Sequence, residues 1–514
     1  MKKLAFLFSV VSLTFLVACG GGGPANPGPG PSGFTNASFS GNFVFSMSGE
    51  CVNACTPITG VPTIEMVGLM VADGKGNITG GTRDLSFAGA YNGQASLTGT
   101  YSVNSDGTAD LALNDGTVTT NYAMILTGTG GGYILSSGNS WAISGSVEQQ
   151  STASIATAPT AKYVFHAHGV NSGSSAWGIA GAMDFTSLVV TADTNRSGTI
   201  GSMQTGALAL APGDYDATKG RGLLTINPSG GDPLPSMGFV YYVVDANTLE
   251  IMSSDVSFGL NGRAELSSGA VASGSVLAGS FAFIASGYPP TGTIQVTEGG
   301  IFTGDGHGAI TSGTIDSIYD DSVNSEFGAA MTATGTVTTS NGVTRDDLVI
   351  ANNAATSISM TNASVWFANS GRGFFLTTSA DRAETGIINV QSGAPFTDAA
   401  TYAFGVTGWA FVPVGVSGTN PEGIASATLF KNSGGTVSAY TQIQNLFGIA
   451  TKGTGTGTLT FDSTGTLGSL NLDNTPQGGT ENLRIYQYST SNGFIMQINA
   501  GIVSSGQMTV QTAQ

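Results

Sequence analysis

Charged residues are scarce in this 514-residue chain: only 9% are Asp, Glu, Lys or Arg, and 32 acidic residues outnumber 15 Lys and Arg. The formal net charge is −17. This balance argues against nucleic acid as a partner, because a protein that binds phosphate backbones needs a basic surface. It also argues against electrostatic adhesion to anionic lipid.

Histidine is nearly absent, with three residues in the chain, so catalysis by an imidazole base has few possible sites. The sequence contains no Gly-x-Ser-x-Gly elbow, no His-Glu-x-x-His motif and no phosphate-binding loop. Acidic pairs occur at Asp320-Asp321, with Glu326 close by, and at Asp214 and Asp216. Such carboxylates suit glycoside hydrolysis only when they face each other across a cleft. A secreted hydrolase is therefore the weakest hypothesis, and we expect neither enzyme activity nor a cofactor.

Long helical patterns rich in Ala, Glu, Lys and Leu are also missing. Glycine is instead very abundant, with 77 residues, and short apolar runs alternate with Gly, Asn, Asp and Ser-Gly clusters. This pattern is typical of an all-β protein with many short strands and tight turns.

The N-terminus has the order of a secretory signal. Lys2 and Lys3 form a positive region, and Leu4 to Val17 is an apolar run that is too short and too N-terminal for an ordinary membrane span. The segment Leu16-Val17-Ala18-Cys19 resembles the lipobox of bacterial lipoproteins. The alternative is an ordinary cleaved signal followed by a chance cysteine.

The resemblance to lipoproteins implies that residues 1–18 are removed and that the thiol of Cys19 carries lipid, which makes acyl chains the membrane anchor. Loss of the two lysines gives a charge of −19. Gly20 in place of Asp favours the outer membrane in this family. Residues 19–35, rich in Gly and Pro, form an extended tether. The predicted location is therefore the outer membrane or cell surface, with the folded part outside the cytoplasm.

The other two cysteines are Cys51 and Cys55. In an oxidising compartment this even pair can close a small loop by a structural disulfide. Free thiols are the alternative. A metal site would need further ligands, and none stand nearby in the sequence.

A seven-residue pattern occurs four times: aromatic, any, Phe, any, apolar, any, Gly. Its copies begin at Phe43, Tyr163, Phe281 and Tyr402, which lie 120, 118 and 121 residues apart. A repeat of this length is right for one domain and too long for a solenoid coil. The predicted domains are 36–152, 156–275, 276–394 and 397–514.

Each repeat has the strand pattern of a small barrel. In the first repeat we predict eight strands, at 41–48, 63–72, 77–87, 95–103, 108–114, 117–127, 132–137 and 141–148. Eight sequential antiparallel strands can close into an up-and-down barrel, which removes exposed edges. The pattern is similar to calycin-like barrels in strand count only. A two-sheet sandwich is the alternative. A transmembrane barrel is disfavoured because a lipid anchor would be redundant and the last residues, Thr512-Ala513-Gln514, are not aromatic.

Two further features keep step with the repeats. Turn signals stand at Asp73–Ile78, Asp193–Ile200, Asp305–Ile310 and Asn432–Val437. A short segment with glycine closes each repeat, at Gly145, Gly269, Gly386 and Gly506.

Two groups are candidate metal ligands. His166 and His168 project to one face of a strand, although an exposed polar face is the simpler interpretation. Asp193, Asn195 and Ser197 resemble the start of a calcium loop, but Gln204 stands where a bidentate Glu is expected, so a turn is favoured. The four tryptophans could stack on sugars, but core packing is their ordinary role: Trp141, Trp177, Trp366 and Trp409.

Two hypotheses remain ahead of the hydrolase. The first is a non-enzymatic surface lipoprotein for interaction, adhesion or envelope structure, which would contact a glycan or protein. The second is a binding protein whose barrels hold small apolar ligands or glycans. An open barrel interior lined by the repeated aromatic residues would favour the second hypothesis.

Overall fold

A computed structural model of the chain describes residues 33–52, 63–87, 90–128, 130–138, 140–171, 175–210, 213–229, 235–290, 295–319, 324–353, 359–392, 399–410, 422–476, 478–499 and 501–512. These residues form 33 strands and one short 3-10 helix, η1 (Asn36–Ser38). None of the helices within the described ranges has the length and hydropathy of a membrane-spanning segment. The predicted lipidation site Cys19, the signal and most of the tether lie outside these residues.

The strands form four antiparallel units that we call barrels 1 to 4. Barrel 1 contains β1 (Ser40–Cys51), β2 (Thr63–Asp73), β3 (Asn77–Phe87), β4 (Ala90–Ser96), β5 (Thr98–Val103), β6 (Thr108–Asn114), β7 (Thr119–Leu126), β8 (Gly131–Ser136) and β9 (Trp141–Gln149). Barrel 2 contains β10 (Lys162–Asn171), β11 (Ala176–Asp184), β12 (Val189–Arg196), β13 (Thr199–Ala209), β14 (Arg221–Pro228), β15 (Met237–Asp245), β16 (Thr248–Ser253) and β17 (Phe258–Leu266). Barrel 3 contains β18 (Ala278–Tyr288), β19 (Val296–Asp305), β20 (Ile310–Tyr319), β21 (Asn324–Ser340), β22 (Val343–Asn352), β23 (Asn362–Asn369), β24 (Arg372–Thr377) and β25 (Ala383–Val390). Barrel 4 contains β26 (Thr401–Ala410), β27 (Glu422–Ser433), β28 (Thr436–Leu446), β29 (Ile449–Phe461), β30 (Leu467–Asp473), β31 (Thr480–Gln487), β32 (Asn492–Gln497) and β33 (Ile502–Gln511).

Each barrel closes by pairing its last strand with its first, so the predicted up-and-down barrel is confirmed and the sandwich is wrong. In barrel 1 both β4 and β5 pair with β3, and together they take the place of a fourth strand. The sequence predicted one strand at 95–103. The break falls at Leu97, after a register shift in the β3–β4 pairing and a positive φ at Gln94.

The repeated motif supplies the first strand of each barrel. Because side chains alternate along a strand, Phe43, Phe45 and Met47 point inward and join the buried core of barrel 1. The glycine of the last strand packs against this motif: a Cβ atom on Gly145 would lie 1.8 Å from the Ser46 carbonyl oxygen. Glycine therefore permits the close approach that closes the barrel.

The second repeat departs from two sequence predictions. The turn around Ser197 and Gly198 joins the third and fourth strands of barrel 2, whereas the other three predicted turns join second and third strands. The glycine that faces the first strand is Gly262, opposite Ala167, rather than Gly269. Short Gly-rich turns are alike in sequence, so only the strand register distinguishes them.

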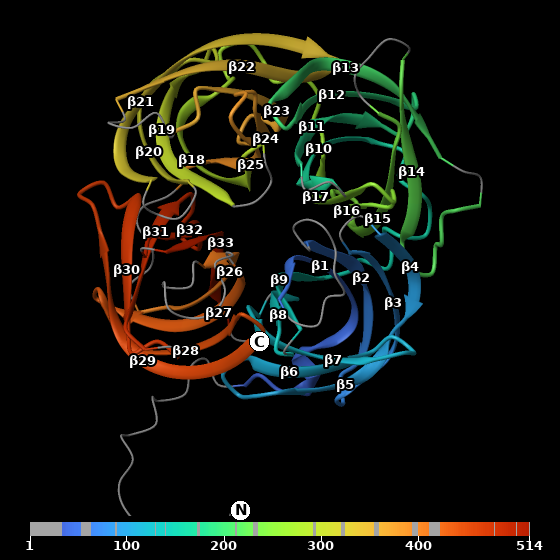
Figure 1. The fold of residues 1–514 in the computed structure, drawn as a ribbon, viewed down its shortest axis with the longest axis vertical. Coiled ribbons are helices and arrows are strands. Elements are labelled where there is room, and N and C mark those ends of the chain that lie inside the picture. Colours follow the sequence, from blue (N-terminus) through green and yellow to red (C-terminus); the bar gives the residue numbers. More distant parts are fainter. Residues whose placement is uncertain are drawn as a thin grey trace, which may run out of the picture.

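The four barrels form a ring, seen end-on in Figure 1. Barrel 1 contacts barrel 2 through β2, β16 and β17, and barrel 2 contacts barrel 3 through β11, β24 and β25. Barrel 3 then contacts barrel 4 through β19 and β32, and barrel 4 returns to barrel 1 through β27 and β9. The first strands β1, β10, β18 and β26 lie toward the centre of the ring (Figure 1).

Candidate functional site

Several buried, hydrogen-bonded polar side chains of the described residues lie at the junctions between barrels. In barrels 1, 2 and 3 the third strand carries an aspartate at one register position: Asp84, Asp193 and Asp316. Each aspartate stands opposite a residue of the second strand. That residue in turn stands opposite the fourth residue of the repeated motif on the first strand. Each points out of its own barrel toward the next barrel along the chain.

Asp84 of barrel 1 is fully buried and bonds to barrel 2. Arg221 donates from Nε to Oδ2 and from Nη2 to Oδ1, both at 2.9 Å. The Tyr242 hydroxyl donates to Oδ2 at 2.6 Å. Burial alone would raise the pKa of Asp84, but the hydrogen bonds and charge of Arg221 hold that pKa below its ordinary value.

Asp193 of barrel 2 makes the same kind of contact with barrel 3. Arg345 donates from Nε to Oδ2 at 2.6 Å and from Nη2 to Oδ1 at 3.0 Å. The indole of Trp366 donates to Oδ2 at 2.7 Å. A two-point guanidinium–carboxylate contact fixes orientation as well as charge.

Asp316 of barrel 3 lies further from its arginine than Asp84 and Asp193 do from theirs. It accepts a hydrogen bond of 2.7 Å from the Tyr486 hydroxyl of barrel 4, and the Arg484 guanidinium is 3.8 Å away. Burial raises the pKa of this aspartate. At the junction from barrel 4 to barrel 1, the corresponding residue is Ile443, which packs in an apolar cluster with Ile125.

The predicted exposed face of His166 and His168 is wrong. The side chain of His166 is only 8% exposed and stacks on Phe374 of barrel 3, with ring centroids 4.5 Å apart. The Nδ1 atoms of His166 and His168 lie 3.0 and 2.9 Å from the Thr385 hydroxyl, also in barrel 3. Burial lowers the pKa of both imidazoles, that of His168 to about 4.

The calcium-like segment is occupied by protein contacts. Asp193 is held by Arg345, and the Asn195 side-chain amide donates to the carbonyls of Thr377, Ser379 and Arg382 in barrel 3. Ser197 donates to a neighbouring carbonyl within barrel 2 and forms the predicted turn. Within the described part of the chain, no three His, Cys, Asp or Glu side chains are grouped to hold a metal ion.

A partly exposed charge cluster joins barrels 1, 2 and 3. Arg372 of barrel 3 donates to both oxygens of Glu265 in barrel 2, with Nε 2.9 Å from Oε2. Arg263 pairs with Glu148 of barrel 1 and with Glu250 and Glu265 of its own barrel. Burial raises the pKa of Glu250 to about 7. The cluster holds the three barrels to one another, because its arginines are paired with carboxylates of the same chain.

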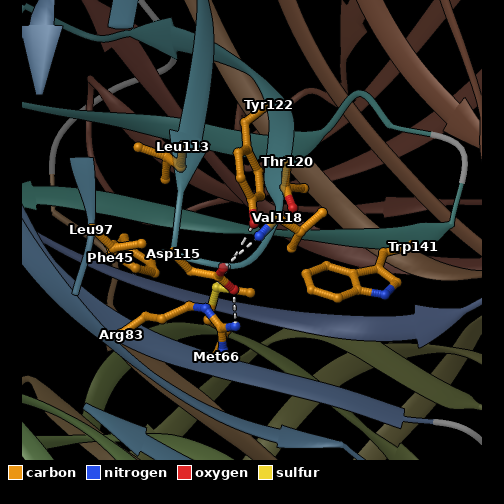
Figure 2. A pocket seen from close by; sticks show the side chains of 10 residues that line it. All are labelled: Phe45, Met66, Arg83, Leu97, Leu113, Asp115, Val118, Thr120, Tyr122 and Trp141. Atoms are coloured by element: carbon orange, nitrogen blue, oxygen red, sulfur yellow. Dashed lines mark hydrogen bonds and ion pairs between the residues drawn. The ribbon is translucent and has the colours of Figure 1, made fainter. Parts of the chain in front are cut away.

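The interior of barrel 1 is filled by side chains. Figure 2 shows the pocket in barrel 1, which is lined by Trp141, Tyr122 and the Arg83–Asp115 ion pair among other side chains. Its cavity is about 10 Å³, room for about one water molecule. Small-molecule sites usually need roughly 300–1,000 Å³, so this pocket does not meet the requirement of the ligand-carrier hypothesis.

Barrels 3 and 4 hold buried carboxyl groups in their interiors. Glu298 accepts hydrogen bonds from Ser317, the Met360 amide and Arg382, and Glu384 lies 4.0 Å from the same guanidinium. In barrel 4, Glu481 accepts from the Gln442 amide, and burial raises the pKa of Glu481 to about 7.

The remaining candidates do not converge on one site. Asp320 and Asp321 lie outside the described residues, and Asp216 pairs with Lys219 near the surface. Trp177 packs in the core of barrel 2, as expected, whereas Trp366 and Trp409 pack between barrels. Cys51 is buried at the end of β1. Cys55 lies outside the described residues, so the Cys51–Cys55 disulfide stays a prediction.

Sequence reasoning missed the buried arginines, which are Arg221 and Arg345 at the junctions and Arg382 inside barrel 3. Arginine and lysine are rare in this chain, and an arginine within a strand pattern is the signal that could have drawn attention to Arg221 and Arg345. The fully buried carboxylates that accept their hydrogen bonds, Asp84, Asp193 and Glu298, lie more than 80 residues away in the sequence, beyond the reach of any local pattern.

No protein-family model matches the chain, and no curated protein matches it significantly. Among solved structures, two mutants of transferrin-binding protein B from Haemophilus parasuis Hp5 align with 75% and 77% of this chain and with 84% of their own chains. Their sequence identity is 9%, and the TM-scores are 0.18 and 0.17. A protein of unknown function from the DUF3598 family of Nostoc punctiforme covers 47% of this chain and 98% of its own, at 9% identity and a TM-score of 0.14. Similarity this low carries no functional argument.

Proposed function

We propose that this protein is a lipid-anchored surface lipoprotein whose ring of four barrels is a rigid, non-enzymatic module for contacting a glycan or another protein. The observation that carries the proposal is how the polar groups are used. The buried arginines and aspartates of the junctions bond to each other across barrels, and the two histidines of barrel 2 bond to Thr385 of barrel 3. They fasten the ring and leave its outer faces for interaction.

The direction of the strands supports a display role. A repeated head-to-tail junction relates each barrel to the next by rotation about the ring axis, so all first strands run the same way along that axis. The start of β1 at Ser40 therefore lies on the same face of the ring as the starts of β10, β18 and β26. A tether that enters at Ser40 would present the face on which the first strands end away from the membrane.

The anchor is tested by intact mass and by protease accessibility on whole cells, with Cys19→Ala as the matched control. We expect an acylated mature mass and cleavage of the barrels on intact cells. The Cys19→Ala protein should lose the acyl mass and be released. An unacylated wild-type chain, or full protection of the barrels in intact cells, would contradict surface display.

The interaction role is tested with the soluble protein that lacks residues 1–35, immobilised through its N-terminus. Arrays of glycans and of envelope proteins serve as probes. Saturable binding that does not consume the probe supports the proposal. Turnover of any probe would contradict a non-enzymatic role.

A second candidate function is a small-ligand site in barrel 1. Arg83 Nη1 is buried there without a hydrogen-bond partner, next to the apolar lining of the pocket in Figure 2. Binding would require the barrel to open. Trp141 lines this pocket, so titration with apolar carboxylates should change its fluorescence in the wild type and not in Arg83→Gln. An unchanged wild-type spectrum would exclude the site.

A further inference from the structure

The four junctions between barrels are one interface used four times. In each, a residue of the third strand meets the fifth and sixth strands of the next barrel. We call the residues of the next barrel at this position the receiving residues. One lies on the fifth strand and stands opposite one on the sixth strand, and the four pairs are Arg221 with Tyr242, Arg345 with Trp366, Leu467 with Tyr486, and Thr108 with Ile125.

The two sides of each junction vary together. Asp84 and Asp193 meet an arginine on the fifth strand. For Asp316 the equivalent position on the fifth strand of the next barrel is Leu467, paired with Tyr486, and Arg484 on the sixth strand supplies the cation instead. Ile443 has no charge, and its receiving position holds Thr108 and Ile125, with Ile125 in the same apolar cluster as Ile443.

A second contact is shared by unlike junctions. Asn195 lies two residues after Asp193, and Asn445 lies two residues after Ile443. Each side-chain amide donates to several carbonyls of the next barrel, those of Thr377, Ser379 and Arg382 for Asn195 and those of Ser136, Gly138 and Trp141 for Asn445. This asparagine therefore contributes to docking whether the junction is charged or apolar, and it does not select between the two kinds of junction.

We propose that the residue at the position of Asp84, Asp193, Asp316 and Ile443 is the determinant by which each barrel selects the next. An aspartate against Ile125 would be buried without a cation, and an isoleucine against Arg221 would leave a buried guanidinium without its carboxylate partner Asp84. Wrong pairings are thus disfavoured from both sides, which is how specificity is obtained against similar surfaces.

The surface of barrel 4 around Ile443 has barrel 1 as its partner. Head-to-tail interfaces either close into a ring or continue into open chains of copies. The junction of barrels 4 and 1 joins the two barrels that are furthest apart in sequence. Its apolar pairing at Ile443 selects barrel 1, and the tethered barrel 1 of the same chain is favoured over a second copy by its effective concentration.

The test uses the full folded chain in four forms: wild type, Ile443→Asp, Thr108→Arg, and the double variant. Thr108 occupies the position of Arg221, so the double variant rebuilds the charged junction at the closing seam. The probes are small-angle scattering for ring opening and sedimentation velocity for association between copies. Ile443→Val is the control that keeps an apolar side chain.

We expect either single variant to shift the ring at least hundredfold toward the open form, with a larger radius of gyration and concentration-dependent association. The double variant should return to a compact monomer, and Ile443→Val should resemble the wild type. If Ile443→Asp fails to fold, recovery of folded protein by Thr108→Arg is the supporting result. A compact monomer for Ile443→Asp, or a double variant no better than Ile443→Asp, would overturn the proposal.

Discussion

Arg345 of barrel 3 and Asp193 of barrel 2 form a buried ion pair in which two guanidinium nitrogens contact both carboxylate oxygens. Their side chains are 1% and 0% exposed. The same guanidinium also contacts Asp347, whose side chain is 44% exposed. One arginine therefore has a buried partner and a solvated partner. The contribution of a buried ion pair and that of an exposed one can be compared at the same guanidinium.

Removal of the buried partner should be costly. We expect Asp193→Ala to lower the free energy of unfolding by about 3–5 kcal/mol, because it removes the buried carboxylate of Arg345 and leaves only the partly exposed Asp347 as its partner. Asp347→Asn, the matched control, should cost less than about 1 kcal/mol. Urea unfolding measures both values. The double variant Asp193→Leu with Arg345→Met should recover much of the loss. Equal effects of the two single variants would refute this account of the junction.

The close approach of first and last strands gives a second prediction. A Cβ atom on Gly145 would lie 1.8 Å from the Ser46 oxygen, whereas a Cβ atom on Gly80 in the same barrel meets nothing within 4 Å. We expect Gly145→Ala to cost about 1–3 kcal/mol through overpacking and Gly80→Ala to cost little. Thermal unfolding of the two variants checks the difference. A Gly145→Ala protein as stable as Gly80→Ala would show that the strands can separate without penalty.

The histidines between barrels 2 and 3 predict sensitivity to acid. Burial lowers the pKa of His168 from 6.5 to about 4, so the folded protein binds fewer protons than the unfolded chain between these values. Stability from this group is present above pH 6.5 and is lost as the pH falls toward 4. The loss should reach up to about 3 kcal/mol. His168→Gln should flatten this dependence in unfolding curves between pH 7 and 4, and the control His307→Gln, at an exposed residue, should not.

Glu481 predicts the opposite dependence in barrel 4. Burial raises the pKa of Glu481 from 4.5 to about 7, with Gln442 as its hydrogen-bond donor. The folded protein therefore holds this proton more tightly than the unfolded chain, and stability falls as the pH rises from 4.5 through 7. Glu481→Gln should match the wild type near pH 4.5 and exceed it by about 3 kcal/mol at pH 8. An unchanged difference across this range would place the ionised carboxylate in a solvated site.

The sequence by itself determined the repeat, the fold class and most strands. Seven of the eight strands predicted for the first repeat correspond to single observed strands. The remaining one, predicted at 95–103, is divided between β4 and β5. The reason is local: alternation of Phe43, Phe45 and Met47 and glycine in the turns are features of neighbouring residues. The turn around Ser197 was identified for the same reason, although its place in the strand order was not.

The tertiary structure alone decided how the barrels use their outer faces. Asp193 and Asn195 resemble a calcium loop in sequence, and His166 and His168 resemble an exposed face, yet all four contact barrel 3. Outward residues of a barrel strand look alike in sequence whether solvent or another barrel covers them. Their partners lie more than 150 residues away in the sequence, so only the closing of the ring determines which charge is paired and which imidazole is buried.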